Sequence, residues 1–457
     1  MITCLLGKVV CAPGVFSDQA HRSGAGNGTR LSSGDLHCYS AKTISARLQG
    51  VSSGSTFMFR SLGYTFAQFA ASALKSKPGA RQMVAFAGKL ALAPMVRSGE
   101  LPTRLMALEH GADLVWGPEV VDKKIIKCSR SQNDKLGTVD FLEPNGKVAF
   151  RTLPSKEKGR LIFQLGSADP DLAAQAAAVV AGDVDGIDLN CGCPKPFSTH
   201  AGMGAALLSD PERLTSILSR LVKDVGKKFN IPISAKIRLL DEHDPQPSLD
   251  LIRKICDTGI SNLTLHCRTR SMRNRESPIR QFLPEIIETV QSRNVSFMIN
   301  GAIRNRSEFE ALRQEFGSSV GGMIAESAEA NPSVFSEKPL AWNQVVPKFI
   351  DIAESLDNHI SNTKYVVTNQ IPGKSPLYQM VCQAKTYKDL NESLKSIDQF
   401  AEGDKIIIRY LQKHILLDPE AFDQYEYSTT TKKRRSSQSD SARDLSNEDK
   451  SKLLKTA

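Results

Sequence analysis

The 457-residue chain contains no run of 18 consecutive apolar residues, and even its richest stretch, 172–181, is interrupted by Gln175. We therefore expect no membrane span. Nine cysteines are present, but their spacings form no even framework of short intervals. This pattern disfavours a disulfide-stapled secreted fold and, because no further Cys or His stands at ligand spacing, it also disfavours a metal site. Reduced thiols inside the cell are expected.

Acidic residues are scarce at the start of the chain. Residues 1–82 hold nine Lys or Arg residues, against Asp18 and Asp35 as the acids, and no clear periodicity persists. Such an acid-poor leader is typical of a mitochondrial transit peptide, although a disordered arm or a gene-model extension has the same composition. The whole chain has a net charge of +10, which favours polyanionic partners such as nucleic acid.

From Leu90 onward, short apolar runs alternate with helical patterns. Eight runs read as strands: 90–94, 113–116, 161–164, 186–190, 233–236, 263–266, 297–300 and 321–325. Eight successive βα units predict an α/β fold, the (βα)8 TIM barrel. Between the second and third runs, Asn145-Gly146 lies between alternating segments and predicts a small surface hairpin.

After Asn331 the pattern is helical and contains no strands. Helices are predicted at 342–356, 361–371, 378–384 and 390–410, which together would form a smaller all-helical domain. The expected organisation is a basic leader (1–82), the barrel (83–338), the helical domain (339–426) and a disordered charged tail (427–457). The basic run 432–435 in that tail is a solvated end, a nuclear signal or an RNA-attracting arm.

Five predicted strands end in a polar residue, namely Gln164, Asn190, Lys236, His266 and Asn300. The carboxyl ends of barrel strands meet at one face, where barrel enzymes hold their active sites. A buried polar side chain needs a partner or a ligand, so five of them at one face predict a bound polar cofactor. A flavin ring suits this set, with amides at its pyrimidine edge and a lysine near its negative charge.

Smaller residues are expected to complete this pocket. Ala93, Pro94 and Met95 would supply apolar surface beside the ring. Gly301 and Ala325 follow the last two strands, where barrels commonly bind phosphate through backbone N–H groups.

The fourth strand leads into Asp188-Leu-Asn-Cys-Gly-Cys-Pro194, which places a thiol at the same face as a candidate acid, nucleophile or ligand. Around this motif the chain resembles the tRNA-dihydrouridine synthases, most of all the eukaryotic synthase 2 class. The matching segments are 92–97, 111–115, 163–166, 186–195, 198–211, 236–238, 266–270 and 300–301.

The resemblance implies an FMN-dependent reduction of the C5=C6 bond of a uridine in the D-loop of tRNA, at position 20. Hydride would pass from reduced FMN to C6, a cysteine would protonate C5, and NADPH would reduce the flavin again. The cysteine before proline is the acid in this family, which here is Cys193. Its ordinary pKa near ~8.5 keeps a thiol mostly protonated at neutral pH. Cys191 occupies the variable position and serves as an internal control.

Further residues are candidates for contact with RNA or substrate. Asn190 would hold substrate or flavin, and Arg268 and Arg270 would grip RNA phosphates, although surface salt bridges are an alternative. Motif position adds three weaker candidates at the rim, namely Arg97, Lys195 and His200. Beside His200, a glycine-rich segment predicts a mobile loop over the substrate.

Glu326 departs from the family, which commonly has a basic residue there, so phosphate binding would need another cation. Two other functions stay open: a flavin oxidoreductase of free pyrimidines and a non-catalytic RNA-binding barrel scaffold. We expect tRNA as the partner of a monomer, with neither metal nor membrane. The expected location is the cytoplasm and nucleus, or the mitochondrion if the leader is a transit peptide.

Overall fold

The computed structural model describes residues 83–371 and 375–398. Eight parallel strands in this part form a closed barrel, in which β2 pairs with both β1 and β7. The strands are β1 (Leu90–Leu92), β2 (Leu114–Trp116), β7 (Leu161–Gly166), β8 (Gly186–Asn190), β9 (Ile233–Arg238), β10 (Asn262–His266), β11 (Ser296–Asn300) and β12 (Gly321–Ile324). All eight predicted runs are strands, and the predicted TIM barrel is confirmed. The leader and tail predictions lie outside the described residues.

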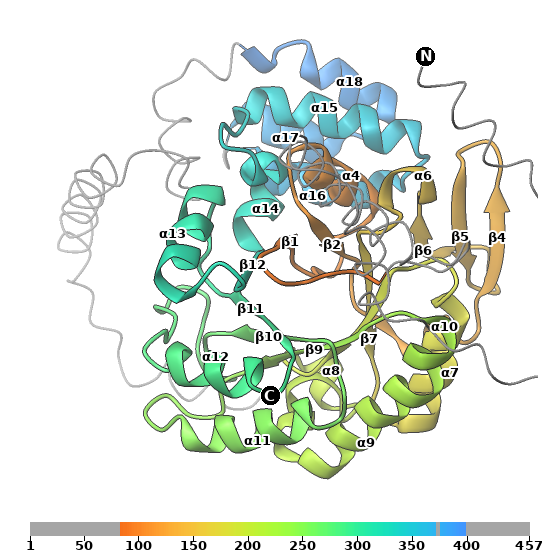
Figure 1. The fold of residues 1–457 in the computed structure, drawn as a ribbon. Helices are drawn as coiled ribbons and strands as arrows, with labels where there is room; N and C mark the ends of the chain where they lie inside the picture. Colours follow the sequence, from red (N-terminus) through yellow and green to blue (C-terminus); the bar gives the residue numbers. More distant parts are fainter. Residues whose placement is uncertain (1–82, 372–374, 399–457) are drawn as a thin grey trace, which may run out of the picture. The chain divides into compact units, whose positions relative to one another are not determined.

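Helices surround the barrel (Figure 1). They are α4 (Leu101–Glu109), α5 (Asp122–Ile125), α7 (Pro170–Val180), α9 (Pro211–Leu221), α11 (Gln246–Cys256), α12 (Leu283–Gln291), α13 (Arg306–Phe316) and α14 (Glu326–Ala330). Two of them begin at Asp-Pro pairs, where the Asp169 carboxylate accepts hydrogen bonds from the N–H groups of Asp171 and Leu172, and Asp210 accepts from Arg213. These caps satisfy N–H groups that a helix leaves without partners. None of the helices in the described ranges has the length and apolarity that crossing a membrane requires.

The predicted surface hairpin is confirmed by β5 (Thr138–Leu142) and β6 (Val148–Thr152), which pair on either side of Asn145-Gly146. Gly146 has φ +82°, in the left-handed region that glycine tolerates. A third strand, β4 (Ser129–Asn133), extends the hairpin to a three-stranded sheet. No sequence pattern indicates β4, because Ser-Arg-Ser-Gln-Asn is polar throughout and offers no apolar alternation.

The C-terminal region is helical, as predicted, with α15 (Trp342–Ser355), α16 (Ile360–Gln370), α17 (Pro376–Gln383) and α18 (Tyr387–Leu394). The predicted helix 390–410 begins too late and is interrupted at 395–396, and its predicted end at 410 lies outside the described residues. The helix α18 starts earlier because Thr386 caps it, and it ends at Leu394. This region packs on the barrel: Met106 of α4 belongs to its apolar core. Two polar contacts reinforce the packing, from Lys348 Nζ to Glu109 Oε1 at 2.6 Å and from Arg151 to the carbonyl of Leu356 at 2.6 Å.

Candidate active site

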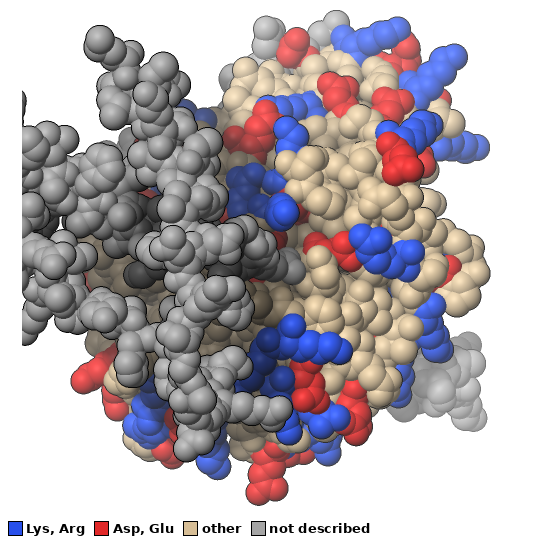
Figure 2. All heavy atoms as spheres, turned by 45° about the vertical axis from the view of Figure 1, so that its right-hand side comes forward, with Lys and Arg blue, Asp and Glu red and all other residues tan. Residues whose placement is uncertain are grey.

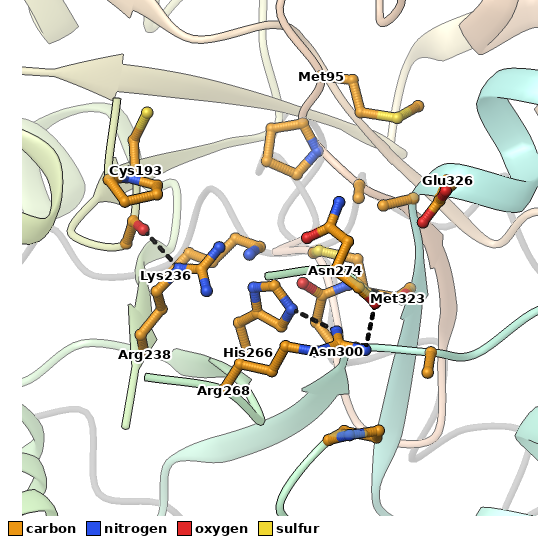
Figure 3. A pocket seen from close by; sticks show the side chains of 18 of the residues that line it. Met95, Cys193, Lys236, Arg238, His266, Arg268, Asn274, Asn300, Met323 and Glu326 are labelled. Carbon is orange, nitrogen blue, oxygen red and sulfur yellow. Dashed lines mark hydrogen bonds between the residues drawn. The ribbon is translucent and has the colours of Figure 1, made fainter. Parts of the chain in front are cut away.

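A cavity of about 860 Å³ opens where the carboxyl ends of the barrel strands meet. It lies within the size range of small-molecule sites. All nine predicted cofactor-binding residues line it, namely Ala93, Pro94, Met95, Gln164, Lys236, His266, Asn300, Gly301 and Ala325. The same walls contain Cys193, Asn190, Lys195 and Arg268, as Figure 3 shows for several of them. Arg97, His200 and Arg270 do not line the cavity and are exposed.

A row of polar side chains lies beneath the cavity. Gln164, Asp188 and Ser234 occupy register positions on the adjacent strands β7, β8 and β9. Asp188 is fully buried and accepts hydrogen bonds from Gln164 Nε2 at 2.8 Å and from Ser234 Oγ at 2.5 Å. Burial raises the pKa of Asp188 to about 6, so at neutral pH this carboxylate only accepts hydrogen bonds. Gln164 therefore turns its NH₂ toward Asp188 and keeps Oε1 as its free acceptor.

Hydrogen bonds to the backbone also fix the orientation of two asparagines at strand ends. Asn190 Oδ1 accepts from the N–H groups of Gly192 at 3.0 Å and Cys193 at 3.1 Å, which turns its NH₂ away from this loop and toward Glu119. Asn300 donates Nδ2 to the carbonyl of Met323 at 2.9 Å, which leaves Oδ1 as the free acceptor. The protein thus fixes which end of each amide is available to a ligand.

Basic side chains form one wall of the cavity (Figure 3). Burial and the neighbouring Arg238 lower the pKa of Lys236 to about 8. Burial and nearby cations lower the pKa of His266 far below its ordinary value, so its ring is neutral. The guanidinium nitrogen Nη1 of Arg268 lies 3.0 Å from His266 Nε2. Because a guanidinium only donates hydrogen bonds, Nε2 is the acceptor and the ring proton is on Nδ1.

Cys193 lies half-buried in the loop after β8 and faces the cavity. Burial raises the pKa of its thiol, and the Lys195 backbone N–H opposes that shift. The loop is held from below, because Arg238 Nε donates to the carbonyl of Gly192 at 2.8 Å. Cys191 is fully buried in the apolar core instead. The two cysteines of the motif therefore have different surroundings, and Cys193 is the thiol that a ligand can reach.

The family model described as dihydrouridine synthase (Dus) matches residues 91–413. The chain belongs to the dihydrouridine synthase family. It is 49% identical to a Saccharomyces cerevisiae protein named tRNA-dihydrouridine(20) synthase [NAD(P)+], over 72% of this chain and 89% of that protein. The Schizosaccharomyces pombe protein of the same name is 46% identical, over 68% of this chain and 65% of the relative.

Other matches are weaker. A human protein named tRNA-dihydrouridine(20a/20b) synthase [NAD(P)+]-like is 30% identical over 58% of this chain and 76% of that protein. The higher identities to the two tRNA-dihydrouridine(20) synthases, 49% and 46%, confirm the expected likeness to the synthase 2 class. A 2-naphthoyl-CoA reductase structure is similar at a TM-score of 0.37 and 10% identity, over 54% of this chain and 49% of that one. A likeness of that size carries no information on function.

The structure of this dihydrouridine synthase family member adds site residues that the sequence prediction missed. Arg238 had a usable signal, because it follows Lys236 by two positions and side chains two apart on a strand face the same side. No sequence signal pointed to Glu119, because it lies in a loop after β2. Burial raises the pKa of Glu119 to about 7, and the Asn190 side chain and the positive charge of Lys195 oppose that shift.

Arg268 also lies differently from the expectation of a surface grip. Its guanidinium points inward and donates to the carbonyls of Glu276 at 2.7 Å and Asn274 at 3.0 Å, in addition to its contact with His266. It therefore organises the loop that forms one side of the cavity. Its contact with RNA stays a prediction.

The residues present fit a flavin. A pyrimidinedione edge offers one N–H donor between two carbonyl acceptors, and the free acceptors of Gln164 and Asn300 lie in the same cavity as the donors of Lys236 and His266. A Cβ at Gly301 (φ +114°) would lie 3.0 Å from His266 Cδ2, so only glycine leaves this part of the cavity open. Within the described part of the chain, no group of three or more His, Cys, Asp or Glu side chains is arranged to hold a metal ion.

The end of the cavity near Gly301 also contains a cationic side chain, whose positive charge can offset the negative charge of Glu326. Arg280 lines the cavity, and its Nη2 donates to the carbonyls of Gly301 at 3.1 Å and Ala302 at 3.3 Å. Its Nε is buried and has no acceptor among the described residues. A buried donor without a partner is costly, so a ligand acceptor at this end would stabilise the site.

Proposed function

We propose that this protein reduces the C5=C6 bond of a uridine in tRNA to give 5,6-dihydrouridine, with FMN as the cofactor and NADPH as the reductant. The half-buried Cys193 thiol carries the proposal, because it faces a cavity whose polar side chains match an imide ring. The name of the relative with 49% identity supports both the reaction and position 20 as the target.

When bound and reduced, the flavin supplies the hydride equivalent that C6 of uracil accepts. Addition at C6 leaves carbanion character at C5, which needs an acid nearby. Cys193 Sγ–H is that acid in our proposal. Its raised pKa keeps the proton on sulfur until negative charge develops at C5. Asn190 offers its NH₂ to a substrate carbonyl beside Cys193, while Lys236 stabilises negative charge on the cofactor.

The remaining assignments are parts of the same proposal. Residues 83–338 form the catalytic domain, and the helical domain 339–426 contacts tRNA. Arg97, Lys195, His200, Arg268 and Arg270 stay candidates for contact with RNA. We place the monomeric protein in the cytoplasm and nucleus, with the mitochondrion as the alternative that the basic leader supports.

The test is incubation of the purified protein with NADPH and unmodified tRNA, followed by nuclease digestion and mass spectrometry. We expect one D-loop uridine to gain two hydrogen atoms, and we expect free uracil to stay unchanged. Turnover of free pyrimidine without RNA would instead indicate an oxidoreductase of small molecules. A colourless protein that binds tRNA without reducing it would indicate a scaffold.

A further inference from the structure

Two exposed large apolar side chains line the cavity. In the described part of the chain, six large apolar side chains are exposed: Met83, Val96, Val148, Phe197, Leu240 and Met380. Two of them, Val96 and Phe197, line the cavity. Phe197 is the aromatic one of the six and the most exposed, at 50%. An exposed aromatic ring beside a ligand cavity is accessible to the part of a ligand that extends beyond the cavity.

The local backbone holds Phe197 outward. It lies in the short helix α8 (Pro196–Thr199), directly after the loop that contains Cys193. The next residue, Ser198, is fully buried, and its carbonyl accepts from the N–H of Met203 at 3.0 Å. Ser198 is thus anchored in the core while the adjacent Phe197 side chain is exposed. Its exposure is therefore a built feature of this loop.

A second aromatic ring reaches the cavity from the helical region. Tyr365 of α16 lines the cavity, and the guanidinium carbon of Arg97 lies 3.7 Å from the centre of its ring. Arg97 has φ +73°, an unfavourable conformation for a residue other than glycine. Asn362 stabilises that conformation by donating to the Arg97 carbonyl at 2.6 Å. The structure thus holds a flat cation stacked on a flat ring at this mouth.

Positive charge accompanies the rings. Lys195 is exposed two residues before Phe197, and exposed Arg275 lines the cavity. Figure 2 shows Lys and Arg mixed with Asp and Glu over one face of the molecule, so the surface in view is not uniformly basic. Aromatic rings combined with local cations are the recognition chemistry of single-stranded nucleic acid, whose bases stack and whose phosphates pair with cations.

We propose that Phe197 and the Arg97–Tyr365 pair form a stacking rim that binds the nucleotides on either side of the uridine that enters the cavity. This inference rests on the proposed function. A base that leaves the stack to enter an active site leaves the two neighbouring bases each with one unstacked face. The rim would cover those faces, so the preferred partner is an unpaired RNA segment and not a continuous duplex.

The test compares Phe197→Leu, which keeps apolar bulk but removes the ring, with Phe197→Tyr, which keeps the ring. Loss of one stacked base weakens binding by about 5- to 150-fold. We expect the tRNA Kd of Phe197→Leu to rise by at least about fivefold, in line with that range, and that of Phe197→Tyr to stay within about twofold of the wild type. Val148→Ala, which removes an exposed apolar side chain of the surface hairpin away from the cavity, should leave the Kd unchanged.

A second readout reports stacking directly. Replacing a nucleotide next to the reduced uridine with 2-aminopurine should give fluorescence that the wild type and Phe197→Tyr quench and Phe197→Leu does not. The circular dichroism spectrum and the Tm should be the same in all variants, which verifies that each one is folded. Equal Kd and equal quenching for Phe197→Leu and the wild type would overturn the rim. Absence of dihydrouridine with wild-type protein would instead overturn the proposed function.

Discussion

Glu119 offers a prediction whose size follows from the structure. Its carboxyl is buried, and burial raises its pKa from 4.5 to about 7 despite the opposing effects of Asn190 and Lys195. In the unfolded chain this carboxyl ionises near its ordinary pKa, whereas in the folded protein it stays neutral until about pH 7. Stability is therefore full below pH 4.5 and falls as the pH rises toward 7, above which the loss is complete. The shift corresponds to a loss of up to about 3 kcal/mol.

Replacing Glu119 with Gln removes this ionisation and keeps the shape of the side chain. The variant and the wild type should have similar thermal stability near pH 4.5, and by pH 8 the variant should be more stable. An advantage of up to about 3 kcal/mol corresponds to a rise in Tm of up to roughly 5 °C for a domain of this size. Differential scanning fluorimetry of both proteins from pH 4.5 to 8.5 measures this difference directly.

Glu326→Gln is the matched control, because Glu326 lines the same cavity with an exposed side chain. Its Tm difference from the wild type should stay small at every pH, since solvent screens surface charge. A Glu119→Gln difference that does not grow with pH would refute the reasoning. A variant that is less stable than the wild type at pH 8 would refute it as well.

Two further predictions concern the ligand side of the cavity. Gly301→Ala should weaken flavin binding at least about tenfold, because backbone strain and a new Cβ beside His266 would distort the ligand cavity. Gly317→Ala is the control, because Gly317 also has a positive φ, +107°, but has open space around its Cβ. It should lower Tm and leave the flavin Kd unchanged. Asp188→Leu should also weaken flavin binding about tenfold by leaving the Gln164 NH₂ unpaired. Asp188→Asn should be much milder, because Asn still accepts from Gln164 and can donate to the Ser234 hydroxyl. Flavin titration by fluorescence measures each Kd; unchanged binding in Gly301→Ala, or equal effects of the two Asp188 substitutions, would contradict these roles.

The barrel and its strand-end residues could be predicted because each depends on local pattern. Apolar runs, Asp-Pro caps and a period of two along strands are enough to place Gln164 and Lys236 at one face of the barrel. The positions of loop residues cannot be predicted from local pattern in this way. Glu119 reaches the cavity because Gly166 leaves room for it, since a Cβ there would lie 2.4 Å from Glu119 Oε1. Tyr365 reaches it from a helix about 200 residues after Gln164, which only tertiary packing decides.

The direction of a side chain after a strand end could not be predicted either. Arg268 and Arg270 are two positions apart in one loop, yet Arg268 turns inward to hold backbone carbonyls and Arg270 is exposed. Hydrogen bonds to Asn274 and Glu276 decide that difference, and neither partner is recognisable from residue spacing. The contrast between Cys191 and Cys193 could be expected from the motif, and the structure supplies its physical basis in burial.

The central claim is that Cys193 donates the proton to C5, and a pair of variants tests it most directly. Single-turnover reduction of tRNA by flavin-loaded protein, with dihydrouridine measured by mass spectrometry, should slow at least about 100-fold in Cys193→Ala, since a general acid contributes about 10²–10⁴-fold. Flavin content and its reduction by NADPH should be unchanged. Cys191→Ala should keep its rate within about twofold and lose about 1 kcal/mol of stability from a small cavity in the core. Unimpaired dihydrouridine formation by Cys193→Ala would contradict the account.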